Sequence, residues 1–177
     1  MTLAAAPKDV VIRSETASDH AAIGELTSLA FSTASHSSGT EAEIIERLRQ
    51  QGALALSLVA TCEGVIVGHV AFSPAQGDEQ ASRWLALGPV SVAPHLQRCG
   101  IGKALISAGL DMLKEQGAEG CILVGDPAYY GRFGFVAAVQ HCPPGIPPDY
   151  YMMLSFGGEP PSGVLGFHPA FFGPAQE

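Results

Sequence analysis

The residues with the clearest chemical potential form the stretch Gln97-Arg98-Cys99-Gly100-Ile101-Gly102. It stands between an apolar run at 84–92, which predicts a strand, and an amphipathic pattern at 103–114, which predicts a helix. Glycines at i and i+2 let the backbone approach a ligand without an intervening Cβ atom. A helix that starts there directs its unpaired N–H groups and the positive end of its dipole into the turn. The stretch therefore predicts an anion site, most often one for phosphate.

The residues around this turn distinguish between the known kinds of phosphate site. A dinucleotide fingerprint, G-x-G-x-x-G, needs a third glycine where this chain has Leu105. A P-loop needs Gly-Lys followed by Ser or Thr, and here Ala104 follows Lys103. The pattern that remains is Gln97-x-x-Gly100-x-Gly102, which matches a Q/R-x-x-G-x-G/A motif. A plain strand-to-helix turn without a ligand is the alternative.

A second motif, Gly125-Asp126-Pro127-Ala128-Tyr129-Tyr130-Gly131-Arg132-Phe133-Gly134-Phe135, follows further along the chain. With both motifs in this order, the chain resembles the GCN5-related N-acetyltransferase (GNAT) superfamily. It is most similar to the small bacterial YhbS-like predicted acetyltransferases, in which Leu-Gly-Pro precedes the glycine motif as at 87–89 here. The resemblance covers residues 10–156 in the order of the elements.

The resemblance implies acetyl-CoA as co-substrate. Its pyrophosphate would lie on the backbone N–H groups of the glycine turn, in which Gln97, Arg98, Cys99, Gly100, Ile101, Gly102 and Lys103 are the expected binding residues. Pro89 has no N–H to donate, so Gly88-Pro89 should interrupt strand pairing. This would leave the backbone of Val90, Ser91 and Val92 for the pantetheine arm. Cys99 departs from the basic or small residue that the family often has at its position.

The resemblance also implies a direct attack of a primary amine on the thioester carbonyl. Tyr130, five residues before Phe135, would protonate the leaving thiolate as the catalytic acid, and Asp126 would lie near the thiol end of CoA. A buried tyrosine with a satisfied hydroxyl is the alternative for Tyr130. The general base stays open among Asp126, Glu41 and Glu43. A non-catalytic acyl-CoA-binding sensor is the second hypothesis, and transfer to a hydroxyl or from a longer acyl donor is the third.

Composition limits the partners and the location. The net charge of −8 disfavours nucleic acid and anionic membrane as partners, and a hydrophobic fraction of 47% suffices for a core. The four cysteines form no C-x-x-C pair and the six histidines no ligand spacing, so we expect reduced thiols and no metal. The apolar runs and the N-terminus predict a soluble, cytoplasmic protein without a signal peptide. A small-molecule or peptide amine is the expected acceptor, and the protein would be a monomer or homodimer.

The order of the predicted elements is β, α, α, β-hairpin, β, α, β, short α, β, β. It predicts an α+β fold with a mixed, mostly antiparallel central sheet flanked by helices, and the resemblance adds a splayed central strand pair that binds CoA. The hairpin turns at Glu63-Gly64, a capping box of Thr40 and Glu43 starts the second helix, and residues 133–139 form a strand. We expect an acetyltransferase domain at 1–156 and a Pro/Gly/Phe-rich extension at 157–177 packed on it. The loop 32–39, the second helix and the segment after Cys142 would recognise the acceptor.

Overall fold

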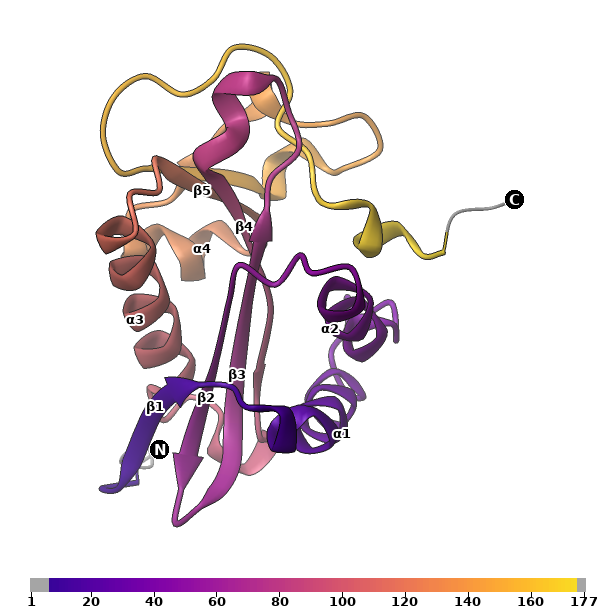
Figure 1. Ribbon diagram of the computed structural model, residues 1–177, viewed down its shortest axis with the longest axis vertical. Coiled ribbons are helices and arrows are strands. Elements are labelled where there is room, and N and C mark those ends of the chain that lie inside the picture. Colours follow the sequence, from indigo (N-terminus) through magenta and orange to yellow (C-terminus); the bar gives the residue numbers. More distant parts are fainter. Residues whose placement is uncertain (1–6, 175–177) are drawn as a thin grey trace.

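The computed structural model describes residues 7–174 of the chain. These residues form a seven-stranded sheet in the order β1-β2-β3-β4-β5-β7-β6, with helices on both faces (Figure 1). The strands are β1 (Val10–Ser14), β2 (Leu56–Cys62), β3 (Val65–Pro74), β4 (Trp84–Val92), β5 (Gly120–Val124), β6 (Val136–Ala137) and β7 (Tyr151–Ser155). The α-helices are α1 (His20–Phe31), α2 (Glu41–Gln50), α3 (Ile101–Glu115) and α4 (Pro127–Tyr130). Neighbouring strands run antiparallel except β4 and β5, which are parallel. The predicted α+β class is confirmed.

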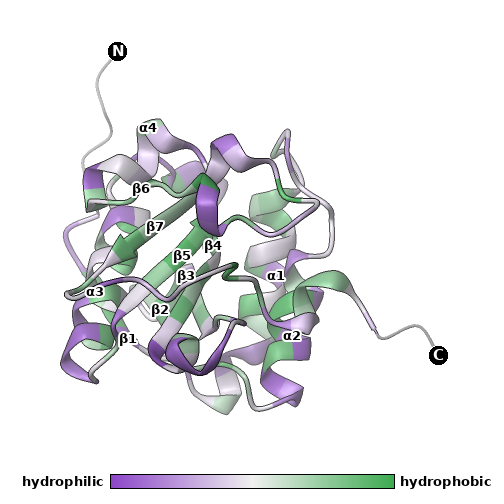
Figure 2. Cartoon of the chain, turned by 90° about the horizontal axis from the view of Figure 1, so that it is seen from above, coloured by the Kyte–Doolittle hydropathy of each residue, from purple (hydrophilic) through white to green (hydrophobic). Residues whose placement is uncertain are grey.

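The α3 helix covers one face of the sheet, and α1 and α2 cover the other (Figure 1). Figure 2 shows the central strands as predominantly hydrophobic, as expected for a sheet covered on both faces. The main core lies between β2, β3 and the buried stripe of α3 that includes Leu105 and Ile106. Gly109 allows this close packing, because a Cβ atom there would lie 2.3 Å from Cε2 of Phe72. The packing fixes the N-terminus of α3 relative to β4.

The β2–β3 hairpin turns at Glu63-Gly64, as predicted. Both residues have positive φ, 50° and 79°, and Cys62 pairs with Val65 across the two-residue loop. This is the geometry of a type I′ turn, whose twist matches that of the flanking strands. The turn therefore fixes how β2 and β3 pair at this end of the hairpin.

The predicted interruption of β4 is a β-bulge. Two residues of β4, Gly88 and Pro89, stand opposite one residue of β3, Ala71. On its other edge β4 pairs with β5 only over residues 84–86, whereas β5 stays paired with β7 as far as Val124. The parallel strands separate beyond Ala86, so the predicted splayed pair is confirmed.

The helix after the glycine turn begins at Ile101, two residues earlier than predicted. Ile101 is buried, and its Cγ2 lies so close to Gly68 of β3 that a Cβ atom on Gly68 would be 2.9 Å away. This long-range burial holds the first turn in helical form. Ile101 and Gly102 consequently belong to the first turn of α3 and not to the loop before it.

Two further local predictions are wrong. The capping box at α2 does not form, because the Thr40 side chain makes no cap hydrogen bond and Glu43 pairs with Arg47 (Nη1–Oε2 3.3 Å). The strand predicted over residues 133–139 is reduced to the two residues of β6. Gly134, with φ of 94°, ends a 3₁₀ turn at that point and redirects the chain.

A buried polar cluster ties α2 to the sheet. The Glu15 carboxylate accepts two hydrogen bonds of 3.1 Å from the Arg49 guanidinium of α2, and one from the Ser57 hydroxyl of β2. The Ser57 hydroxyl also lies 2.8 Å from Nε2 of His69. Burial acts to raise the pKa of Glu15, but His69, Arg49 and Ser57 together lower it to about 2. Burial lowers the pKa of His69, which keeps its ring neutral.

The C-terminal segment at 163–172 packs on the half of the sheet that contains β4, β5 and β7. Gln76 and Gly166 exchange backbone hydrogen bonds of 2.9 and 2.7 Å, and the Tyr151 hydroxyl donates to the Leu165 carbonyl (2.7 Å). The Arg47 side chain of α2 donates to the Ala170 carbonyl (2.9 Å). These contacts bring the aromatic residues of the segment beside α2.

Candidate active site

The glycine turn is a tight loop that leads from β4 into α3. Arg98 and Gly100 both adopt left-handed conformations, with φ of 62° and 87°. Gly100 is the N-cap of α3, and no side chain caps the helix there. Cys99 is buried and its thiol lies 3.6 Å from the Gln97 carbonyl, so it anchors the loop from the inside. The loop thus leaves its outer backbone open to a ligand.

The first turn of α3 offers free hydrogen-bond donors. The N–H groups of Ile101, Gly102 and Lys103 have no acceptor within the helix, because the first helical bond runs from Ala104 to Gly100 (3.0 Å). Within this fully described helix no acidic residue occupies the first turn. Arg98 and Lys103 are exposed and add positive charge. The arrangement suits a diphosphate.

The edge of β4 presents backbone groups to the gap beside β5. The N–H of Ala93 donates to a β3 carbonyl (2.9 Å), and hydrogen-bonded residues alternate along an antiparallel pair. Ser91 is therefore bonded to β3, whereas the backbone groups of Val90 and Val92 face the gap. The Ser91 hydroxyl lies on the face of the sheet that α1 covers, where it donates to Oγ1 of Thr27 (3.2 Å).

Two contacts hold the glycine turn against its neighbours. Nε2 of Gln97 donates to the Val92 carbonyl (3.2 Å), which ties the loop to β4. A Cβ atom on Gly102 would lie 3.2 Å from the Tyr129 hydroxyl of α4 and 3.6 Å from Cγ2 of Val92. The Tyr129 ring itself packs against the Arg132 guanidinium, 4.5 Å from the ring centroid. The sequence analysis did not predict Tyr129 as a site residue, because no pattern near residue 129 indicates that α4 contacts the start of α3.

The short α4 helix carries Tyr130 at the end of β5. Asp126 is its N-cap, and Oδ1 accepts a hydrogen bond from the Ala128 N–H (2.9 Å). The Asp126 carboxylate, predicted at the thiol end of CoA, is exposed and occupied as a helix cap. The Tyr130 ring lies so close to Gly125 that a Cβ atom there would be 2.3 Å from its Cε2. Gly125 therefore sets the position of this ring.

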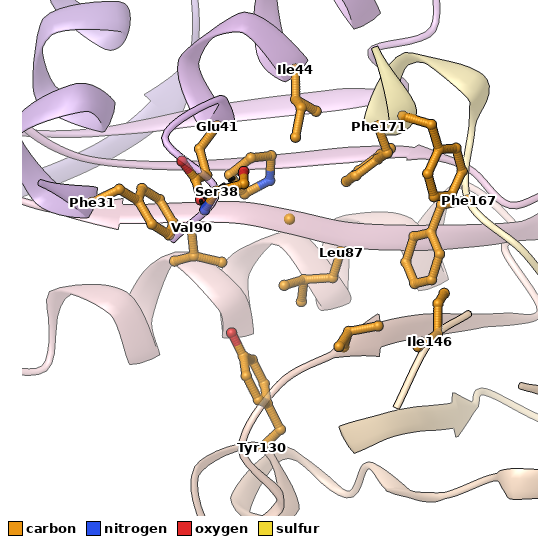
Figure 3. A pocket seen from close by; sticks show the side chains of 14 residues that line it. Phe31, Ser38, Glu41, Ile44, Leu87, Val90, Tyr130, Ile146, Phe167 and Phe171 are labelled. Atoms are coloured by element: carbon orange, nitrogen blue, oxygen red, sulfur yellow. Dashed lines mark hydrogen bonds between the residues drawn. The ribbon is translucent and has the colours of Figure 1, made fainter. Parts of the chain in front are cut away.

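The Tyr130 hydroxyl points into a cavity (Figure 3). No other residue that the structure describes hydrogen-bonds to this hydroxyl, which leaves it available to a ligand in the cavity. Burial, with a smaller contribution from Tyr129, raises the pKa of Tyr130 to about 12. The phenol is thus protonated throughout the neutral range and can act as a donor.

The cavity holds about 440 Å³ and opens beside the β4 bulge. Its walls come from the end of α1, the α1–α2 loop, α2, β4, β5, α4 and the C-terminal segment (Figure 3). Most of the lining is apolar: Phe31, Ile44, Leu87, Gly88, Pro89, Val90, Val124, Ile146, Phe167, Phe171 and Phe172. The polar lining residues are Ser38, Glu41 and Tyr130. The loop, second helix and post-Cys142 segment expected at the acceptor all contribute.

Glu41 is the single carboxylate in this lining, as far as the described residues go. Its two oxygens each lie 3.0 Å from the Ser37 hydroxyl, and one accepts from the Ser38 N–H (2.9 Å). Glu43 lies outside the cavity lining. Of the three general-base candidates from the sequence, only Glu41 shares the cavity with Tyr130.

The phenylalanines of the C-terminal segment were not predicted as site residues. Phe167, Phe171 and Phe172 line the cavity although more than a hundred residues separate them from α2. No local pattern could have indicated this contact, because it depends on the path of the chain back over the sheet. The one available signal was the clustering of aromatic residues in a Pro/Gly-rich tail.

A parallel strand pair that separates between the N-terminus of a helix and a tyrosine is the arrangement of a GNAT-type acyltransferase. Residues 21–135 match the family model described as "Acetyltransferase (GNAT) family". This match covers more than half of the chain, and the protein belongs to the GNAT family.

Individual relatives agree with this assignment. A GNAT family acetyltransferase from Brucella melitensis, solved in complex with acetyl-CoA, is 42% identical, with a TM-score of 0.82 over 92% of this chain and 98% of that one. YhbS from Escherichia coli, solved in complex with CoA, is 31% identical, with a TM-score of 0.83 over 92% of each chain. The sequence named "Uncharacterized N-acetyltransferase YhbS" from strain K12 is 40% identical over 108 residues, which are 60% of this chain. That match spans 65% of the length of YhbS. The predicted resemblance is confirmed.

Three other features of the described residues bear on the sequence expectations. None of the helices within 7–174 is long and apolar enough to cross a membrane. The same residues contain no group of three potential metal ligands. All four cysteines are free thiols, as predicted.

Proposed function

We propose that this protein is an acetyl-CoA-dependent N-acetyltransferase that acetylates the primary amine of a small-molecule or peptide acceptor. The observation that carries the proposal is the gap between β4 and β5. It borders the free N–H groups of α3 near Val92, and the partner-free Tyr130 hydroxyl near Val90. Two related proteins were solved in complex with acetyl-CoA and with CoA, which supports acetyl-CoA as the donor. A cytoplasmic location is part of the proposal.

The glycine turn would hold the pyrophosphate of acetyl-CoA. The N–H groups of Ile101, Gly102 and Lys103 donate to its oxygens, and Arg98 adds charge. Gln97, Cys99 and Gly100 shape the loop so that these donors face outward. The free backbone groups of Val90 and Val92 pair with the pantetheine arm as with a strand, while Ser91 keeps β4 attached to β3. Asp126 acts through α4, which it caps.

The acetyl transfer itself follows from these positions. The amine nitrogen attacks the thioester carbonyl, and a free N–H of β4 stabilises the oxyanion, an effect of about 3–4 kcal/mol. As the C–S bond breaks, Tyr130 donates its proton to the sulfur. The proton that the nitrogen loses on becoming an amide restores the phenol, so the protons balance.

The amine must first lose its own positive charge. An alkylamine with a pKa of about 10.4 requires about 4–5 kcal/mol to become neutral at pH 7. Glu41 lines the cavity and can attract the ammonium and relay its proton to water. We assign this role to Glu41, since Asp126 caps α4 and Glu43 pairs with Arg47.

The experiment that tests the proposal is release of the CoA thiol from acetyl-CoA with a panel of amines. We expect amine-dependent release by the wild type, and a loss of about 100-fold or more in kcat for Tyr130→Phe. Tyr130→Phe should bind acetyl-CoA as tightly as the wild type, measured by thermal stabilisation. Mass spectrometry of the product identifies the acyl group and the acceptor atom.

A non-catalytic acyl-CoA-binding module is the second candidate. Stabilisation by acetyl-CoA without release by any amine would establish that function and contradict ours. The direction of the Tyr130 hydroxyl favours the enzyme, because binding of CoA alone does not require a hydroxyl directed into the acceptor cavity.

A further inference from the structure

The lining of the cavity restricts the kind of amine that can reach Tyr130. We infer that the acceptor is a small primary monoamine with an apolar, preferably aromatic, body and no carboxylate. The inference rests on the proposed function and goes beyond it in naming the acceptor class. Three features of the cavity carry it: its apolar walls, the sign of its charge and the wall that the C-terminal segment adds.

The walls that surround the free space are hydrocarbon. Phe31 and Ile44 lie on the side of α1 and α2, and Phe167 and Phe171 lie on the side of the C-terminal segment, as Figure 3 shows. An aromatic or branched body would replace water against these side chains and gain their contact. The second ammonium of a polyamine would instead lose its hydration against phenyl rings with no carboxylate of its own. This disfavours di- and polyamines.

The single ionisable charge in the lining is negative. The Glu41 carboxylate is oriented by the Ser37 hydroxyl and the Ser38 N–H and can bind one ammonium group. Across the described residues that line the cavity there is no Lys, Arg or His to pair with an acceptor carboxylate. An amino acid would bring its carboxylate into the same space as Glu41, and like charges repel strongly there. Free amino acids should therefore be excluded.

The C-terminal segment limits the size of the acceptor. The Ala170 carbonyl is held by the Arg47 side chain at 2.9 Å, which keeps Phe171 over the cavity next to α2. The volume of about 440 Å³ is in the range of small-molecule sites and must also hold the acetyl end of the donor. A wall at this position narrows the cavity and favours a small molecule over the side chain of a folded protein.

The test compares amines that differ in one feature. We would measure kcat/KM for 2-phenylethylamine, L-phenylalanine and L-phenylalaninamide, which share a benzyl group and differ at the α-carbon. Spermidine and a lysine-containing peptide represent the polyamine and polypeptide alternatives. We expect kcat/KM for 2-phenylethylamine to exceed that for L-phenylalanine by about 100-fold, and the neutral amide to recover most of the loss.

A matched pair of variants locates the discrimination. Glu41→Gln should raise KM for 2-phenylethylamine and reduce the preference over L-phenylalanine by about 10-fold. Glu25→Gln removes the same charge from the exposed face of α1, outside the cavity, and should change neither value. Thermal stabilisation by acetyl-CoA is measured for all three proteins, and it should be equal.

The outcomes separate the inference from the function beneath it. Equal or better use of L-phenylalanine, spermidine or the peptide would overturn the acceptor class and leave the acetyltransferase standing. An unchanged preference in Glu41→Gln would overturn the role of Glu41 in selecting the acceptor. If acetyl-CoA stabilises the protein but no amine is acetylated, both the acceptor class and the catalytic proposal fail.

Discussion

Replacing Gly125 with alanine should slow acetyl transfer by displacing the Tyr130 ring. The added Cβ atom would lie 2.3 Å from Cε2 and 2.7 Å from Cδ2 of that ring. Non-bonded carbon atoms approach to about 3.5 Å, so Cε2 must move by about 1.2 Å. If the side chain gives way by swinging about its Cα–Cβ bond, the hydroxyl lies farther from that bond than Cε2 and moves at least as far. A displacement of about 1 Å at a reacting group can cost about 100-fold in rate, and we expect kcat to fall by that factor.

The assay is steady-state release of CoA thiol, with KM for acetyl-CoA measured in parallel. Gly125 does not have positive φ, so alanine is compatible with its backbone and the effect should come from the ring. Gly131→Ala is the matched control at the other end of α4. Gly131 is helical, and a Cβ atom there meets nothing within 4 Å. This control should retain wild-type kcat and stability.

A double-mutant comparison makes the reasoning falsifiable. If Gly125 acts only by positioning Tyr130, Gly125→Ala should cost little once Tyr130→Phe has removed the hydroxyl. The reasoning would be refuted by a wild-type kcat in Gly125→Ala. An equal loss in both backgrounds, or a loss of acetyl-CoA binding in Gly125→Ala, would refute it as well.

Three further predictions address the proton donor, the cofactor contact and the fold. Because the pKa of Tyr130 is raised to about 12, kcat/KM should rise with pH as the amine acceptor loses its proton, and no decrease should occur at any pH up to 10. A decrease in kcat/KM that begins between pH 8 and pH 10 would contradict Tyr130 as the acid. Tyr129→Phe removes a hydroxyl beside Gly102 and should raise KM for acetyl-CoA about 2- to 10-fold without changing kcat, and steady-state kinetics would show a change in kcat if this is wrong. Glu15, with its pKa lowered from 4.5 to about 2, stabilises the fold above pH 4.5, and this contribution of about 3 kcal/mol is lost as pH falls through 2. Urea unfolding between pH 5 and 2 should therefore show a shallower decline for Glu15→Gln than for the wild type, and equal slopes would contradict the role of Glu15.

The parts of the fold that could be predicted depend on local chemistry. The Glu63-Gly64 turn needs two residues that tolerate positive φ, and Pro89 cannot donate to a ladder wherever it stands. The order of strands and helices follows from the same local periodicities. For these elements the sequence holds the full cause, and the structure agrees with the prediction.

Other features depend on contacts between distant segments. α3 starts early because Ile101 packs on Gly68, and the strand predicted at 133–139 is short because Gly134 turns the chain. The Glu43 side chain has Arg47 as a partner and does not return to the N-cap. The position of Phe171 in the cavity lining depends on how the C-terminal segment returns to α2. No window of sequence contains both halves of such contacts.

A crystal structure of this protein with CoA would show directly whether the gap between β4 and β5 binds the cofactor. We predict the pyrophosphate on the N–H groups of Ile101, Gly102 and Lys103, with the pantetheine arm along Val90 and Val92. We also predict the sulfur within hydrogen-bonding reach of the Tyr130 hydroxyl. A CoA molecule bound elsewhere, or a sulfur atom on the far side of β4 from Tyr130, would contradict this prediction.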